Sequence, residues 1–441
     1  MARRDGMAWG LRAAAVRYRF AESLFLLPSI VMASGILLAI GATSLDTALG
    51  HDADLPFLLT MTNNAALWLL ATVAGAMITT VGVVFSLTVV SLQLASNHFS
   101  PRVMRSFIRD RLSQGVIGLL VGTFFYCVLV LPHLSGEDSD PAPRVSLTIA
   151  VALTLITVIG IIVHLDHLAR SLQVGNVARA IAVEGEKVVA AASRAPRGLE
   201  PVEPKDHPIA DDAIVVPCQS SGWVSQVSVP GLLHAVPPGT TLRLETRVGA
   251  YIHAGEPLLR VSPPVPERAH RTLAAAVEIA DTRTMLQDVD FAIRQLVDIG
   301  LRALSPAIHD PTTAIEVILR LGTVLRAVLV APLPPTGLRD GSGRVLLSPW
   351  NLEHDEYVAH AFDQLRQSSL TEPDVATALL RVLRMLRSHV QDAGQPGSVP
   401  AIERQMRLLL DAVGEAGLHP EDLRRIEAMR SDDTDPADHS H

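Results

Sequence analysis

Four long apolar stretches constrain what this chain can fold into more than any other feature. Each is long enough for a helix to cross a bilayer core of about 30 Å, which takes about 20 residues. The stretches cover residues 24–43, 67–95, 115–134 and 146–165. Most of the apolar excess precedes Asp166, and the rest of the chain has the mixed charge and Pro/Gly content of globular proteins. The pattern predicts a polytopic α-helical membrane protein with four transmembrane helices, followed by a large soluble region.

Basic residues in the short loops predict the orientation of these helices, because they resist translocation. Five arginines precede the first stretch and four lie between residues 97 and 114. The other two loops, residues 44–64 and 135–145, are acidic and hold only Arg144 as a basic residue. Both termini are therefore expected in the cytoplasm. The first stretch is also compatible with a signal peptide, but its length and the three spans behind it favour an uncleaved anchor.

The second stretch carries a regular polar pattern. Its polar side chains recur every seven residues, at Thr72, Thr79, Ser86 and Gln93, and Gly75 and Gly82 repeat with the same spacing. Seven residues are close to two helical turns, so these positions share one face. In a homo-oligomer that face can line an aqueous path for ions. The alternative is close helix packing in lipid, which also uses small and hydroxylated residues.

Basic residues follow directly after the second stretch. Pro101 suits the first turn of a helix, and Arg102, Arg105 and Arg109 are interspersed with apolar residues. The segment is therefore predicted to form an amphipathic interfacial helix, which either anchors the chain to anionic headgroups or acts as a gating elbow. At the inner end of the fourth stretch, His164 and His167 form a second candidate: a proton-responsive pair, half of a metal site, or a simple polar anchor.

Two segments resemble a known family. The run VFSLTVVSLQLAS at residues 84–96, followed by FSPR at 99–102, and the run ALSPAIHDPTTA at 303–314 are similar to bacterial predicted membrane proteins called domain of unknown function 2254. That family commonly has asparagine where His309 stands and a bulkier residue at Thr312. The resemblance extends over nearly the whole chain and implies a bacterial inner-membrane protein. It implies no activity, because the family has none assigned.

Beyond the first 170 residues, composition divides the chain into four further segments. They are a helical linker (171–210), a small β-rich module (211–265), an α-helical cytoplasmic domain (266–430) and an acidic, disordered tail (431–441). The β-rich module resembles the hairpin sandwich of biotinyl and lipoyl domains. It contains no lysine for attaching a prosthetic group, which argues against a carrier role.

A helix elbow in the C-terminal region provides a candidate pocket. Ser305 and Pro306 are expected to end one helix, and Asp310 with Pro311 to cap and begin the next. The polar residues proposed to line this pocket are Asp288, Asp290, Arg294, His309 and Asp310. The alternative is that Asp310 is only a cap and that the upstream acids form a solvated face.

Motifs for chemistry are missing from the sequence. There is no phosphate loop, dinucleotide fingerprint or nucleophile elbow, and the spacing of His354, Asp355, Glu356 and His360 matches no compact zinc signature. A net charge of −8 argues against nucleic acid as a partner. The sequence therefore predicts no enzyme, no metal and no cofactor.

Two functions from different classes fit this sequence. The first is a homo-oligomeric ion channel or channel-like transporter, gated by its cytoplasmic domain, with the bilayer, further copies and ions as partners. The heptad pattern and the acidic outer loops, which would concentrate cations, favour it. The second is a membrane-anchored sensor or scaffold without transport activity.

Overall fold

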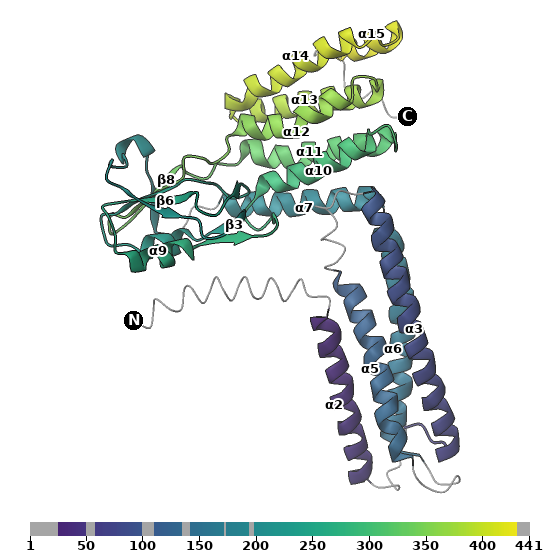
Figure 1. Cartoon of the computed structure of the whole chain (residues 1–441). Coiled ribbons are helices and arrows are strands. Elements are labelled where there is room, and N and C mark those ends of the chain that lie inside the picture. Colours follow the sequence, from purple (N-terminus) through teal and green to yellow (C-terminus); the bar gives the residue numbers. More distant parts are fainter. Residues whose placement is uncertain are drawn as a thin grey trace. The chain divides into compact units, whose positions relative to one another are not determined.

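A computed structural model describes residues 25–49, 58–98, 110–134, 142–171, 173–193 and 198–429 (Figure 1). The chain divides into two compact units between Gln173 and Val174. The first is a helical bundle, here called the membrane unit. The second, here called the C-terminal unit, combines helices with β-sheet.

The membrane unit contains four long helices. They are α2 (Leu26–Leu49), α3 (Asn63–His98), α5 (Arg111–Val130), which continues into the 3-10 turn η1 (Leu131–His133), and α6 (Arg144–Ser171). All four are long and apolar enough to cross a membrane, which confirms the four predicted spans. Helix α5 is central: 44% of its span is buried inside the unit, against 22% or less in the other three.

Glycines set the distance between α2 and α5. A Cβ atom built on Gly35 would lie 2.7 Å from the carbonyl oxygen of Gly122, and one built on Gly118 would lie 2.9 Å from the Cα atom of Pro28. Gly118 and Gly122 are four residues apart and lie on one face of α5, the small-xxx-small arrangement that lets helix backbones approach closely in lipid. The two helices therefore pack backbone against backbone at this crossing.

The C-terminal unit has a layer of stacked helices (Figure 1). These are α7 (Val174–Ala192), α10 (Val289–Ala303), α11 (Pro311–Val330), α12 (His354–Ser368), α13 (Pro373–Asp392), α14 (Val399–Glu415) and α15 (Pro420–Ala428). Their apolar faces meet in a fully buried core, which includes Leu321, Leu325 and Leu383. Helix α7 lies in the predicted linker but packs against α10 and α11. Gly185 permits this packing, because a Cβ atom built on it would lie only 2.9 Å from the Cβ atom of Ala292.

The strands of this unit form two sheets. The larger sheet has the order β1-β8-β9-β4-β6-β2 and the smaller β5-β3-β7. Their bounds are β1 (Leu199–Pro201), β2 (Ile214–Pro217), β3 (Gly222–Val227), β4 (Thr241–Leu244), β5 (Tyr251–Ile252), β6 (Pro257–Ser262), β7 (Val277–Ala280), β8 (Gly337–Asp340) and β9 (Val345–Leu347). Short helices α8 (Val229–His234), α9 (Glu267–Ala274), η2 (Pro204–Asp206) and η3 (Pro396–Ser398) complete the unit.

The larger sheet draws on more of the chain than residues 211–265. Strands β8 and β9 lie inside the region expected to be purely helical, and β9 pairs in parallel with β4, so that Leu242 lies opposite Leu346. Both side chains are buried. Strand β7 also falls in that region and pairs with β3. Strands of three or four residues carry too little periodicity to be predicted from the sequence. They form because they pair with strands that are distant in the sequence.

Candidate functional site

The predicted polar positions of α3 all face away from the rest of the membrane unit. Thr72, Thr79, Ser86 and Gln93 are exposed, whereas Leu70, Met77, Val84 and Ser91 are buried against the bundle. Each exposed residue follows a buried one by two positions, which is about 200° around a helix. A Cβ atom built on Gly75 or Gly82 would meet no atom within 4 Å. We call Thr72, Thr79, Ser86 and Gln93 the outer face of α3.

Hydrogen bonding differs along this outer face. The Thr79 hydroxyl donates to the carbonyl oxygen of Gly75 at 2.7 Å, so it is satisfied within its own helix. Ser86 and Gln93 make no side-chain hydrogen bond to any other described residue. Placing an unpaired glutamine amide in hydrocarbon costs on the order of several kcal/mol of free energy, as it does for other unpaired polar groups. The outer face is therefore better suited to contact with water or another polar surface than with lipid tails.

The proposed gating elbow lies outside the described residues. This applies to Pro101, Arg102, Arg105 and Arg109.

An aspartate joins α2 to the start of α6. Asp46 accepts hydrogen bonds from the backbone N–H of Val145 at 2.9 Å, from that of Ser146 at 2.8 Å and from the Ser146 hydroxyl at 2.6 Å. The carbonyl of Ser146 in turn accepts from the Tyr126 hydroxyl. Asp46 belongs to the first of the two acidic loops (residues 44–64) that are expected to concentrate cations. Instead its carboxylate caps α6, because the first N–H groups of that helix have no partner of their own.

Replacing Asp46 by alanine is expected to lower the free energy of unfolding by about 1–2 kcal/mol, the usual effect of losing a helix cap. Ser44→Ala on the same helix serves as the control, because the Ser44 hydroxyl only bonds Ile40 of its own helix. The comparison is made by thermal denaturation in detergent. Equal melting temperatures of the two variants would contradict the capping role.

A second polar cluster links the other ends of α5 and α6. Asp110 caps α5 by accepting from the N–H of Leu112 at 3.1 Å, and its carboxylate also lies 3.2 Å from Nε2 of His167. The Ser113 hydroxyl lies 3.3 Å from Nδ1 of His164, which is buried. The histidine pair therefore faces Asp110 and Ser113. Among the residues that the structure describes, no group of three side chains is arranged to hold a metal ion.

Three of the five predicted pocket residues meet at the start of α10. Asp288 caps this helix and Asp290 follows in its first turn, both nearly fully buried. Arg283 lies between them, with Nη2 3.0 Å from Asp288 Oδ1 and 2.7 Å from Asp290 Oδ2. Arg294 approaches Asp290 only to 3.8 Å and is more exposed. We call Arg283, Asp288 and Asp290, with His360 described next, the buried ion cluster.

The buried ion cluster ties strands to helices. His360 on α12 places Nδ1 2.7 Å from Asp290 Oδ1, and since an ionised carboxylate only accepts, Nδ1 carries the proton. The guanidinium of Arg283 lies over the rings of Trp223 on β3 and Phe291 on α10, at 5.7 and 5.3 Å from their centroids. These contacts link β3, α10 and α12, so the cluster is a structural connection within the C-terminal unit.

The cluster makes stability depend on pH. Burial raises the pKa of Asp290, but the hydrogen bonds from His360 and Arg283 outweigh it and hold the pKa well below its ordinary value. Because the pKa of Asp290 is lower in the folded than in the unfolded protein, its ionised carboxylate stabilises the fold at pH values above the unfolded pKa of about 4. This contribution to stability is lost as the pH falls. We expect the stability of the wild type to decline between about pH 5 and about pH 2, and more steeply than that of Asp290→Asn. Urea unfolding at several pH values tests this, and parallel profiles would contradict it.

The other two predicted pocket residues lie at the opposite end of α10, about 22 Å along its axis. Asp310 accepts from the N–H of Thr313 at 3.0 Å and caps α11, and Pro311 opens that helix, which confirms the predicted helix elbow. His309 adopts φ 48°, in the left-handed region that asparagine reaches readily. An asparagine, which the resemblance described above leads one to expect at this position, would adopt this backbone conformation more readily than histidine does. The structure therefore does not bring His309 and Asp310 together with Asp288, Asp290 and Arg294.

Four helices able to cross a membrane, joined to a separately packed C-terminal unit, define an integral membrane protein. The chain belongs to the family described as "Predicted membrane protein (DUF2254)", whose model matches residues 21–385. It is similar to two uncharacterized proteins, Mb1321c of Mycobacterium bovis and Rv1290c of Mycobacterium tuberculosis. Each is 34% identical over 361 residues, which is 78% of this chain and 67% of the relative. No solved structure matches.

Proposed function

We propose that the protein is a homo-oligomeric ion channel of the bacterial inner membrane, with no catalytic activity. In this proposal the α3 helices of several copies surround a central path, and the C-terminal unit lies in the cytoplasm and controls it. The observation that carries the proposal is the outer face of α3: its polar residues are exposed and lie opposite the buried face of the same helix.

The way the membrane unit uses its glycines supports assembly through α3. Gly35, Gly118 and Gly122 are already in backbone contact within one copy. A Cβ atom built on Gly75 or Gly82 would meet no atom of another described helix within 4 Å. Small residues at helix surfaces permit close approach of a further helix, and a polar face in hydrocarbon is stabilised when it faces other polar groups or water. Both needs are met when α3 of one copy lies beside α3 of the next.

A membrane-anchored sensor or scaffold is the second candidate. It is favoured by the Thr79 hydroxyl, which is satisfied within its own helix and so tolerates lipid. It is also favoured by the C-terminal unit, which has its own core and its own pocket. In this case the α3 face serves assembly or faces lipid, and no ion crosses.

Substitutions on the outer face of α3 separate the two functions. In liposomes that contain the purified protein, Thr79→Leu and Ser86→Leu are expected to lower ion flux about tenfold or more, because leucine removes the hydroxyls that replace part of the hydration shell of an ion. Thr80→Leu is the matched control: Thr80 lies about 100° around the helix from Thr79, and its hydroxyl bonds Ala76. Flux that is unchanged in all three variants, or absent from the wild type, would leave the sensor or scaffold function.

A further inference from the structure

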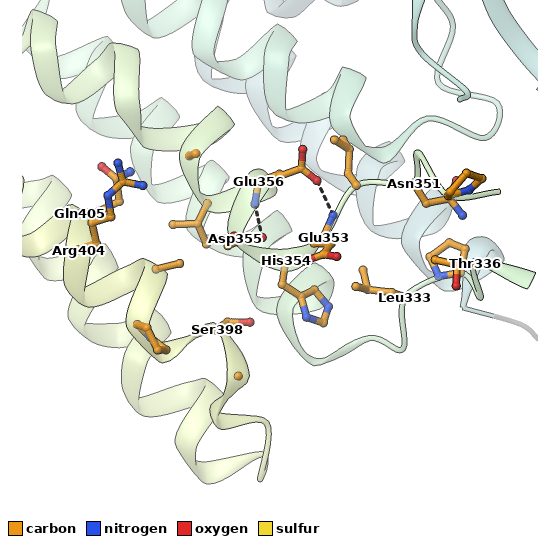
Figure 2. Close-up of a pocket in the computed structure, with 18 residues that line it drawn as sticks. Leu333, Thr336, Asn351, Glu353, His354, Asp355, Glu356, Ser398, Arg404 and Gln405 are labelled. Carbon is orange, nitrogen blue, oxygen red and sulfur yellow. Dashed lines mark hydrogen bonds between the residues drawn. The ribbon is translucent and has the colours of Figure 1, made fainter. Parts of the chain in front are cut away.

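A pocket of about 770 Å³ lies in the C-terminal unit between the first turns of α12 and α14 (Figure 2). The loops that follow α11 and precede α12 complete its walls. Small-molecule sites in proteins commonly have volumes of about 300–1,000 Å³. None of the predicted pocket residues lines it, so it is a separate candidate site.

The α12 wall of the pocket offers hydrogen-bond acceptors and negative charge. It carries the carboxylates of Glu353, Asp355 and Glu356. Two of them accept backbone hydrogen bonds: Glu356 from the N–H of Glu353 at 2.9 Å, and Asp355 from the N–H of Glu356 at 3.0 Å (Figure 2). Nε2 of His354 lies 3.2 Å from the carbonyl oxygen of Ala331. A carbonyl only accepts, so Nε2 carries the proton and Nδ1 of the neutral ring is an acceptor. This wall complements a cationic donor such as an ammonium group.

The α14 wall offers donors and positive charge. Arg404 is exposed and makes no ion pair with another described residue, although three carboxylates line the same pocket. Ser398 is only 3% exposed and occupies the N-cap position of α14, yet its hydroxyl makes no capping bond. Figure 2 shows its side chain directed from α14 into the pocket. The unbonded hydroxyl, the guanidinium and the positive end of a 17-residue helix together complement an anion.

We propose that this pocket binds a small zwitterionic ligand of about the size of a short peptide. Its carboxylate lies at the α14 wall, which carries Arg404 and Ser398, and its ammonium group lies at the carboxylates at the start of α12. Arg404 and these carboxylates line the same cavity and form no ion pair with each other, so a ligand that carries both charges complements both walls. A simple cation or anion meets attraction at one wall and repulsion at the other. Leu333, Leu352 and Val358 also line the cavity and suit an uncharged part of the ligand.

Trialanine and its two blocked forms test the proposal by calorimetry on the full-length protein in detergent. We expect trialanine to bind with a Kd of about 1 mM or tighter, and both N-acetyl-trialanine and trialanine amide to bind at least about tenfold more weakly. Arg404→Gln is expected to weaken the binding of trialanine by about tenfold, because the guanidinium interacts with the carboxylate of the ligand. The binding of trialanine amide is expected to stay unchanged. Ser398→Ala is expected to weaken the binding of trialanine. The ratio of the Kd values of trialanine and N-acetyl-trialanine is expected to stay the same as in the wild type.

Arg407→Gln is the matched control, since Arg407 is an exposed arginine on the same helix that does not line the pocket. It is expected to bind trialanine as the wild type does. Three results would each overturn the proposal: no binding of trialanine to the wild type, equal binding of the blocked forms, or a preference for the free carboxylate that survives Arg404→Gln. Circular dichroism of each variant distinguishes lost binding from lost folding.

Discussion

Replacing Arg283 by methionine is expected to lower the free energy of unfolding by about 3–5 kcal/mol. The substitution keeps an apolar stem against Trp223 and Phe291 but removes the guanidinium between two carboxylates. Asp288 and Asp290 are only 4% and 2% exposed, so their charges are left buried without the main compensating cation. The loss is measured by urea unfolding of the full-length protein in detergent.

Arg294→Met is the matched control for this prediction. Arg294 also faces Asp290, but at 3.8 Å and with 28% of its side chain exposed, against 11% for Arg283. Partly exposed ion pairs contribute about 1 kcal/mol or less. If Arg283→Met and Arg294→Met destabilise the protein equally, the buried ion cluster does not hold strands and helices together as described.

Replacing Gly35 by leucine is expected to separate α2 from α5 and to destabilise the membrane unit by about 3 kcal/mol, the upper part of the range for overpacking. The first side-chain atom would lie 2.7 Å from a backbone carbonyl of Gly122, and a backbone cannot move aside as a flexible side chain can. Thermal denaturation in detergent measures the change, with protease accessibility of α2 as a second readout.

Gly41→Leu controls for the intrinsic effect of leucine in this helix. A Cβ atom at Gly41 would meet nothing within 4 Å, so the substitution adds apolar surface that faces outward. We expect its melting temperature to remain within about 2 °C of the wild type, in keeping with the small effect of surface substitutions. A Gly35→Leu variant as stable as Gly41→Leu would show that the two helices do not meet at these glycines.

Features set by local rules could be predicted from the sequence. The four spans follow from the thickness of the bilayer, and the polar face of α3 follows from helical periodicity. Asp310 and Pro311 indicated the start of α11, because a helix cap involves only residues that are neighbours in the sequence. Each of these inferences needs no knowledge of what lies across the fold.

Features that depend on distant contacts could not be predicted. The contact between Asp290 and His360 joins residues 70 positions apart, and Arg283, another member of the buried ion cluster, lies in a loop without any motif. Strand β9 gains its structure by pairing with β4, and β8 gains its structure by pairing with β9 and β1. The Gly118 and Gly122 pair did carry a signal, a small-xxx-small spacing within the third apolar stretch, which would have indicated the α2–α5 contact. The pocket as a whole carried none, because its walls come from three separate segments, residues 333–336, 349–359 and 397–405.

Single-particle imaging of the full-length protein in detergent tests the proposed channel, because it reveals both the number of subunits and the residues around the symmetry axis. A homo-oligomeric channel is expected to form a ring of identical copies in which Thr72, Thr79, Ser86 and Gln93 surround a continuous axial path. A monomer, or an oligomer whose axis is filled by lipid or by packed apolar side chains, would contradict it.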